Sequence, residues 1–85
     1  MKLFFRTIGE GTPLIILHGL WGASENWLPI AHILENKFRV ILPDARNHGQ
    51  SPHDEEMNYE VMSNDIIELI EDLPLPVRPH IVGHS

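Results

Sequence analysis

The segment from Pro13 to Leu17 is apolar at every position, and it restricts the possible folds more than any other part of the chain. A strand with one face in water alternates apolar and polar residues, whereas a strand covered on both faces is apolar throughout. The run therefore predicts a central strand of a parallel sheet. Such a sheet needs helices packed on both of its faces.

Helical patterns separate this run from two further apolar segments, at residues 40–42 and 80–82, and a strand-like segment at 3–8 precedes it. Gly9 to Gly11 is expected to form the turn after the first strand. The apolar residues of the two predicted helices recur at helical spacing. They are Trp27, Ile30, Ala31 and Leu34 in the first helix, and Met62, Ile66, Leu69 and Leu73 in the second.

Polar residues indicate where the predicted helices begin. Ser24 or Asn26 is available as the N-cap of the first helix and Asn58 as that of the second, because such side chains accept hydrogen bonds from the free N–H groups of a first turn. Pro74 and Pro76 end the second helix, since proline cannot continue it. We expect most of the polar residues of the second helix to face water, and these are Glu60, Asn64, Asp65, Glu68, Glu71 and Asp72.

The order strand, strand, helix, strand, helix, strand predicts an α/β fold with a mostly parallel sheet and helices on both faces. Residues 1–85 contain no internal repeat or low-complexity linker, so we expect one continuous unit. Because 85 residues is less than the usual size of an α/β enzyme domain, we expect a fragment of a single domain. Ligands of such sheets bind at the carboxyl ends of the strands.

Charge and composition argue against several kinds of partner. The chain has 12 acidic residues against 6 Lys plus Arg, a formal net charge of −6, and no basic cluster, so we expect no nucleic-acid partner. The apolar runs are too short to cross a bilayer or to form a signal peptide, so we expect no membrane partner and a cytoplasmic location. The absence of cysteine excludes disulfides and thiolate metal sites from this segment.

The histidines do not form a metal-binding pattern. No two of them are four residues apart on one predicted helix, and H-E-x-x-H does not occur, so we expect no metal ion. Scattered histidines of this kind are more often hydrogen-bonded or exposed. The loop Gly19 to Gly22 lacks the Lys-Ser/Thr pair of a phosphate-binding loop, which argues against a nucleotide.

Three motifs follow the predicted strands, and they are His18-Gly19-Leu20-Trp21-Gly22, Asp44-Ala45-Arg46-Asn47-His48-Gly49-Gln50-Ser51 and Gly83-His84-Ser85. The last begins a G-x-S-x-G nucleophile elbow, a sharp turn that presents a serine oxygen at the top of a sheet. In order and spacing, the motifs resemble the α/β-hydrolase superfamily, and within it the small single-domain bacterial serine esterases. The resemblance covers essentially the whole chain and implies that residues 1–85 are the N-terminal portion of a single α/β-hydrolase domain. The matching residues are Gly19, Asp44, Arg46, Gly49, Ser51, Gly83 and Ser85.

The resemblance implies a serine hydrolase that cleaves small acyl esters or thioesters through an acyl-enzyme intermediate, without a cofactor. It implies Ser85 as the nucleophile and the backbone N–H of Leu20 as one donor of the oxyanion hole, which stabilises the tetrahedral intermediate. In this fold the second donor, the catalytic acid and the catalytic histidine follow the nucleophile. We therefore expect residues 1–85 alone to be inactive and to need the remainder of the domain as a partner.

Other residues near the motifs have supporting roles in this interpretation. Trp21 is a candidate wall of the substrate pocket, and Trp27 is more typical of a core residue. Adjacent residues at a strand end point to opposite faces, so His84 is not the expected base for Ser85. We interpret five residues as structural support: His18, through a hydrogen bond that holds the oxyanion loop, Gly19, Asp44, Arg46 and Gly83.

Two alternatives stay open. The same serine on the same fold supports cofactor-free haloperoxidase or perhydrolase activity and C–C bond hydrolysis. Serine instead of aspartate at position 85 argues against relatives of haloalkane dehalogenase and epoxide hydrolase. If 85 residues were the whole protein, it would be a truncated, non-catalytic interaction module, and this alternative predicts an exposed final strand.

Overall fold

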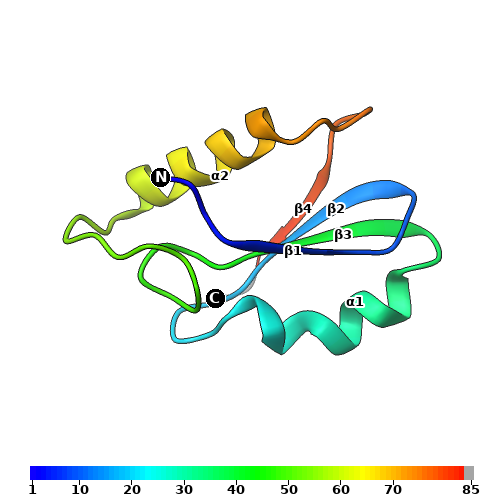
Figure 1. Ribbon diagram of the computed structural model, residues 1–85, viewed down its shortest axis with the longest axis horizontal. Coiled ribbons are helices and arrows are strands. Elements are labelled where there is room, and N and C mark those ends of the chain that lie inside the picture. Colours follow the sequence, from blue (N-terminus) through cyan, green and yellow to red (C-terminus); the bar gives the residue numbers. More distant parts are fainter. Residues whose placement is uncertain (84–85) are drawn as a thin grey trace.

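The computed structural model describes residues 1–83, which form a four-stranded sheet with a helical layer on each face (Figure 1). The strands are β1 (Phe5–Ile8), β2 (Thr12–Leu17), β3 (Phe38–Pro43) and β4 (His80–Gly83). The helices are the short 3₁₀ helix η1 (Ser24–Trp27), α1 (Leu28–Leu34) and α2 (Tyr59–Asp72). The α/β class and the predicted order of strands and helices are confirmed.

The sheet is mostly parallel, and its strand order is β1-β3-β2-β4. β2 pairs in parallel with β3 on one side and with β4 on the other, whereas β1 pairs antiparallel with β3. From β2 the chain crosses to β3 on one side, and from β3 it returns past β2 to β4. In an open α/β sheet, such a reversal leaves a crevice at the carboxyl end of the strand between the two crossings.

Alternate residues of β2 and β3 pack against helices on opposite faces of the sheet. Figure 1 shows α1 on one face and α2 on the other. Each face of the sheet therefore has its own apolar core. Burial of one such side chain stabilises the fold by about 1.5–3 kcal/mol. The core under α1 contains Leu14, Ile16, Ala31, Val40 and Leu42, and the core under α2 contains Ile15, Ile41 and Leu69.

The turn between β1 and β2 requires glycine at both ends. Gly9 and Gly11 have φ values of 90° and 124°, and a Cβ on either would collide with backbone oxygens of residues 35–38. The N–H groups of Glu10 and Thr12 donate to carbonyls in the same segment at 3.1 and 3.3 Å. The turn therefore lies against the connection between α1 and β3 and fixes where β3 enters the sheet.

The first turns of the helices are capped in different ways. Asn58 caps α2 as predicted, since its Oδ1 accepts the N–H of Val61 at 2.9 Å. The prediction that the side chain of Ser24 or Asn26 caps the first helix is wrong, because neither η1 nor α1 has a side-chain cap. The N–H of Ser24 donates instead to Oδ1 of Asp44 at 2.6 Å, so the capping carboxylate comes from a distant part of the chain.

One of the polar residues of α2, which were expected mostly to face water, is buried. Asp65 is 3% exposed, whereas Glu60 and Glu71 are exposed as predicted. Asp65 lies one helical turn before the buried Leu69, and the guanidinium of Arg46 neutralises its charge there.

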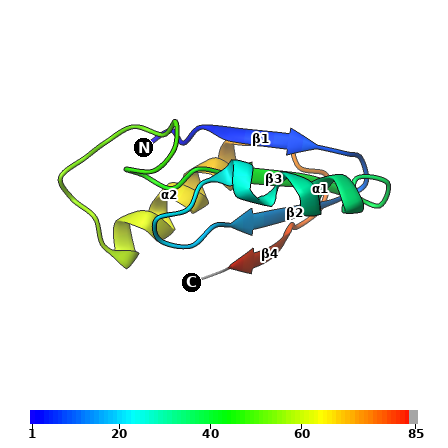
Figure 2. The same ribbon diagram turned by 90° about the horizontal axis from the view of Figure 1, so that it is seen from below.

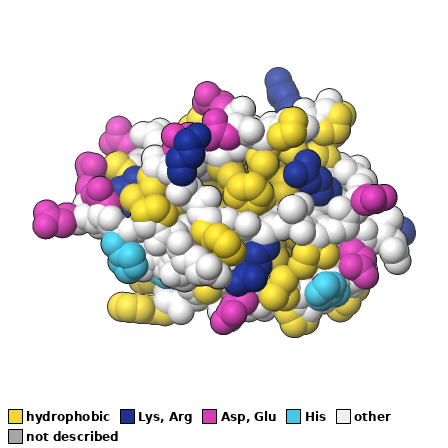
Figure 3. Space-filling view, viewed as in Figure 1, with side chains coloured by type: hydrophobic (Ala, Val, Ile, Leu, Met, Phe, Trp, Pro, Cys, Tyr) yellow, Lys and Arg dark blue, Asp and Glu magenta, His cyan; other side chains and the backbone are white. Residues whose placement is uncertain are grey.

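The surface combines an open sheet edge with dispersed charges. β4 lies at an edge of the sheet, and all of its residues are exposed. On the face seen in Figure 3, Lys and Arg side chains lie among hydrophobic and acidic ones. Neither α1 nor α2, nor any other helix within residues 1–83, has the length and apolar character needed to cross a membrane.

Replacement of Gly11 by alanine should lower the free energy of unfolding by at least about 1–3 kcal/mol, because its φ is strained for any residue with a Cβ. The added methyl group would also collide with the carbonyl oxygen of Lys37. Urea unfolding of the full-length protein measures the change. Glu10→Ala is the control, and this exposed residue should change stability by less than about 0.5 kcal/mol. Equal stability of the two variants would contradict the role of Gly11.

Candidate active site

The carboxyl ends of β2, β3 and β4 lie at the same end of the sheet (Figure 2). Gly83 pairs with Leu17, so the last residue of β4 lies directly beside the last residue of β2. We denote residues 18–23, which follow β2, as the first loop, and residues 44–58, which follow β3, as the second loop. His84 and Ser85, the predicted elbow residues that follow β4, lie outside the described residues.

The first loop holds the peptide group between Gly19 and Leu20 by its carbonyl oxygen. That oxygen accepts the N–H of Gly22 at 3.0 Å and lies 2.8 Å from Nδ1 of His18. Because a trans peptide is planar, its C=O and N–H point in opposite directions, and the N–H of Leu20 is turned away from these partners. Within residues 1–83 this N–H has no hydrogen-bond acceptor. Among the described residues it is therefore a free donor, and the contacts of its peptide carbonyl hold it at the carboxyl end of β2.

A hydrogen bond from the second loop determines the tautomer of His18. The N–H of Ala45 donates to Nε2 of His18 at 3.0 Å, so this nitrogen carries no proton. In the neutral ring the proton is then on Nδ1, from which it is donated to the carbonyl of Gly19. His18 thereby connects the second loop to the peptide group that carries the Leu20 N–H.

Trp21 combines an unusual backbone conformation with an exposed ring. Its φ is 68°, and its side chain is 91% exposed. The hydrogen bond between Gly22 and Gly19 closes a β-turn centred on Leu20 and Trp21, and a positive φ at the second central position is the mark of type II, where glycine is usual. The N–H of Trp21 donates to Nε2 of His48 at 3.3 Å. The turn is therefore also attached to the second loop.

The second loop is folded around the carboxylate of Asp44, which is 1% exposed. Its Oδ1 accepts the N–H of Ser24 at 2.6 Å, and its Oδ2 accepts the N–H of Gln50 at 2.9 Å. Burial by itself would raise the pKa of the Asp44 carboxyl, but the hydrogen bonds from Gln50 and Ser24 outweigh it and hold the pKa below its ordinary value. Gly49 leaves room for this carboxylate, because a Cβ there would collide with it.

Ser51 attaches the second loop to the segment before β1. Its hydroxyl donates to the carbonyl of Asp44 at 2.6 Å and accepts the N–H of Phe4 at 2.9 Å. The N–H of Asp44 in turn donates to the carbonyl of Phe4 at 2.9 Å. Both ends of the motif from Asp44 to Ser51 are thus held against the same backbone segment.

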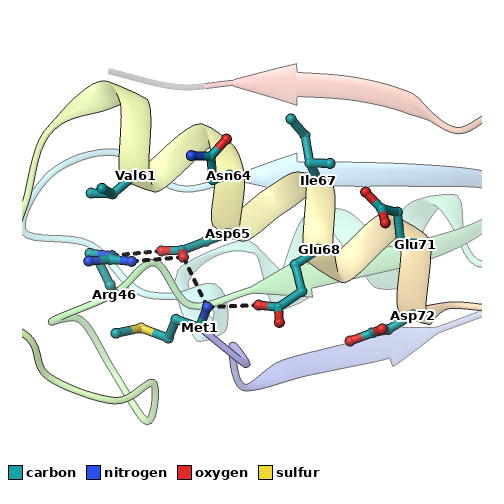
Figure 4. A pocket seen from close by; sticks show the side chains of 9 residues that line it. All are labelled: Met1, Arg46, Val61, Asn64, Asp65, Ile67, Glu68, Glu71 and Asp72. Carbon is teal, nitrogen blue, oxygen red and sulfur yellow. Dashed lines mark hydrogen bonds and ion pairs between the residues drawn. The ribbon is translucent and has the colours of Figure 1, made fainter.

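Arg46 connects the second loop to α2 through a bidentate ion pair with Asp65 (Figure 4). Nε donates to Oδ2 at 2.7 Å and Nη2 to Oδ1 at 2.8 Å, while Nη1 donates to the carbonyl of Glu56 at 2.7 Å. Burial by itself would raise the pKa of Asp65, but the guanidinium of Arg46 holds it below its ordinary value. The position of the second loop therefore depends on where α2 packs.

A shallow cavity of about 410 Å³ borders this ion pair, and most charged groups around it already have partners. The α-ammonium group of Met1 contacts Glu68 at 2.7 Å, and Lys2 contacts Asp72. Figure 4 shows Met1 between Asp65 and Glu68, with the carboxylates of α2 around it. No group of His, Asp and Glu within residues 1–83 is arranged to hold a metal ion. The cavity has no feature of a ligand site.

The structure brings the predicted site residues within residues 1–83 to one region and adds others that the sequence reasoning did not select. His48 was counted among the scattered histidines, although its place in a motif at a strand end was an available signal. Asp65 was placed among the residues expected mostly to face water, although its position four residues before Leu69 lies within the apolar stripe of α2. The predicted residues brought together are His18, Gly19, Leu20, Trp21, Asp44, Arg46 and Gly83, and the added ones are Ser24, His48 and Asp65. Ser51, which the motif matched without a role, contacts Asp44 in the same region.

Comparisons with known proteins identify the family. The model of the alpha/beta hydrolase fold matches residues 12–85. Over 77 residues the chain is 43% identical to the sn-1-specific diacylglycerol lipase ABHD11 of Xenopus laevis, covering 88% of this chain and 24% of that protein. Over 76 residues it is 35% identical to the esterase YbfF of Escherichia coli, covering 89% and 30%. The structure of a marine microorganism esterase matches with a TM-score of 0.94 and 52% identity, covering 99% and 32%.

The chain therefore belongs to the α/β-hydrolase fold family, as its motifs indicated. The names of these relatives describe esterases and a lipase, which are hydrolases. The chain spans about a quarter to a third of the length of these relatives.

The stability of the protein should fall in acid because of Asp44 and Asp65. Both carboxyls have a folded-state pKa below their ordinary value of 3.8, so the unfolded chain binds protons more readily than the folded protein. Their stabilising contribution is therefore complete above about pH 5 and is lost as the pH falls below about 4 through the folded-state pKa. Urea unfolding of the full-length protein between pH 7 and 3 measures this loss. Asp44→Asn should flatten the profile, and an unchanged slope would contradict the assignment.

Asp65→Ala should lower the free energy of unfolding by about 3–5 kcal/mol, because it leaves the buried guanidinium of Arg46 without its partner. Chemical unfolding of the full-length variant at neutral pH measures the loss. Glu71→Ala, on the exposed face of the same helix, is the matched control and should change stability by less than about 0.5 kcal/mol. A loss for Asp65→Ala that is no larger than that of the control would show that the ion pair contributes little.

Proposed function

We propose that the full-length protein is a serine hydrolase that cleaves small acyl esters or thioesters, with Ser85 as nucleophile and the N–H of Leu20 as one oxyanion-hole donor. The observation that carries this proposal is the free N–H of Leu20 at the end of β2, beside the strand that leads to Ser85. Gly83 pairs with Leu17, and adjacent strands are about 4.8 Å apart, so β4 ends next to the strand from which the first loop begins.

The proposed reaction is acyl transfer in two steps. The hydroxyl oxygen of Ser85 attacks the substrate carbonyl carbon while its proton passes to a histidine, which in this fold follows the nucleophile along the chain. The carbonyl oxygen becomes negatively charged and accepts the N–H of Leu20, and the alcohol or thiol then leaves with the proton. Water hydrolyses the acyl-enzyme in the same way. This chemistry needs no cofactor.

The first loop also supports an apolar acyl group as the preferred substrate portion. The side chains of Leu20 and Trp21 are 63 and 91% exposed beside the proposed donor. An exposed aromatic ring next to a reacting centre can cover one side of an acyl chain at little entropic cost. The relatives' names, a diacylglycerol lipase and esterases, are consistent with an ester substrate for this protein as well.

The test is hydrolysis of p-nitrophenyl acetate by the full-length protein together with labelling by a fluorophosphonate. Ser85→Ala should lower kcat by about 10⁴-fold or more and abolish the label, because the nucleophile is lost. Ser63→Ala, an exposed serine on α2, should retain both activity and label. Hydrolysis and labelling that persist in Ser85→Ala would overturn the proposal, as would the absence of both in the folded wild-type protein.

A further inference from the structure

Two histidines join the first and second loops by reciprocal hydrogen bonds. His18 of the first loop accepts the N–H of Ala45 in the second loop at 3.0 Å, and His48 of the second loop accepts the N–H of Trp21 in the first loop at 3.3 Å. The two rings also lie against each other, with centroids 5.2 Å apart and planes tilted by 52°. Each loop therefore offers its imidazole nitrogen to a backbone amide of the other.

The two histidines act on the two peptide groups that flank Leu20. His18 contacts the carbonyl of the Gly19–Leu20 peptide, and His48 accepts the N–H of the Leu20–Trp21 peptide. Type I and type II turns differ by a flip of the peptide between the two central residues, which here is the Leu20–Trp21 peptide. The hydrogen bond to His48 therefore selects one of the two orientations of this peptide.

The conformation that His48 selects is one that Trp21 does not favour by itself. A residue with a Cβ at a φ of 68° is strained, and such strain persists only where surrounding contacts enforce it. The ring of Trp21 is 91% exposed, so its packing within residues 1–83 does not hold the turn. The contacts that remain are those of the backbone, and the N–H of Trp21 donates to His48.

A second hydrogen bond of His48 favours the tautomer that this contact requires. Its Nδ1 lies 2.8 Å from the carbonyl oxygen of Arg46, so in the neutral ring the proton is on Nδ1 and Nε2 is free to accept. Arg46 is fixed in turn by its ion pair with Asp65 of α2. A continuous series of contacts thus leads from α2 through Arg46 and His48 to Trp21.

We infer that His48 is a positioning residue for the oxyanion hole: by accepting the N–H of Trp21 it holds the left-handed backbone of Trp21, and with it the turn whose first central residue, Leu20, carries the N–H that the reacting carbonyl oxygen accepts. The inference rests on the proposed function, because the Leu20 N–H has this task only in an acyl-transfer enzyme. His48 touches neither the substrate nor the reacting atoms in this role.

A pair of substitutions separates the acceptor of His48 from its donor. The amide oxygen of glutamine is as many bonds from Cα as Nε2 of histidine, whereas the amide nitrogen of asparagine is as many bonds away as Nδ1. His48→Gln therefore keeps an acceptor for Trp21, and His48→Asn keeps a donor for the carbonyl of Arg46 but loses that acceptor. Thermal unfolding checks that both full-length variants are folded to a similar extent.

Steady-state hydrolysis of p-nitrophenyl acetate should show a kcat at least about tenfold lower in His48→Asn, with KM changed by less than about twofold. The upper limit is about 10²–10³-fold, which is the loss expected when one oxyanion-hole donor is removed altogether. His48→Gln should retain kcat within about threefold of the wild type, because the acceptor is kept. Equal losses in the two variants, or no loss in either, would overturn the inference and leave the proposed function intact.

A second measurement tests whether His48 acts through the backbone of Trp21. Glycine adopts a positive φ without strain, so in a Trp21→Gly background the turn no longer needs to be enforced. The kcat penalty of His48→Asn should then fall from at least about tenfold to less than about threefold. The same penalty in both backgrounds would overturn the mechanism. Retention of full activity in Ser85→Ala would instead overturn the proposed function, and the positioning role with it.

Discussion

The buried carboxylate of Asp44 holds together the loops at the carboxyl ends of β2 and β3. At 1% exposure it has lost most of its hydration, and its oxygens must find donors within the protein. One oxygen takes the N–H at the start of η1 and the other takes the N–H of Gln50, so a helix start and the second loop are held by the same group. Its backbone is fixed as well, by Phe4 and Ser51. Loops that belong to different crossings are thereby brought to one place.

The parts of the fold that follow from local patterns could be predicted from the sequence. The run from Pro13 to Leu17 predicted a strand covered on both faces, and Asn58 predicted the start of α2, because burial on a sheet and capping of a first turn both depend on residues within a few positions. The cap of η1 could not be predicted in this way, since its acceptor, Asp44, is 20 residues away along the chain. The burial of Asp65 had a local signal in the apolar stripe of α2, but its partner Arg46 lies in a loop 19 residues away and could not be predicted.

The candidate site likewise has features that could be predicted from the sequence and features that could not. The resemblance of its motifs to the α/β-hydrolases implied Leu20 as a donor and Ser85 as a nucleophile, and these assignments stay predictions. The tautomers of His18 and His48 could not be predicted from the sequence, because they depend on hydrogen bonds from backbone amides of the opposite loop. The positive φ of Trp21 could not be predicted from the sequence either, because residue preferences at this position of a turn favour glycine. Features that require a contact across two loops therefore needed the structure.

The strand order has a consequence for how the molecule assembles. β1 and β2 are joined by a short turn, yet they are not neighbours, because β3 lies between them. The two strands therefore cannot zip together as a hairpin when they leave the ribosome, and β1 finds its place only after residues as far along as Pro43 are available. Closure of such sequence-distant contacts is slow compared with local pairing. β1 precedes β2 and β3 along the chain, yet it joins the sheet only through β3, and it is bound by the segment that leads into Asp44.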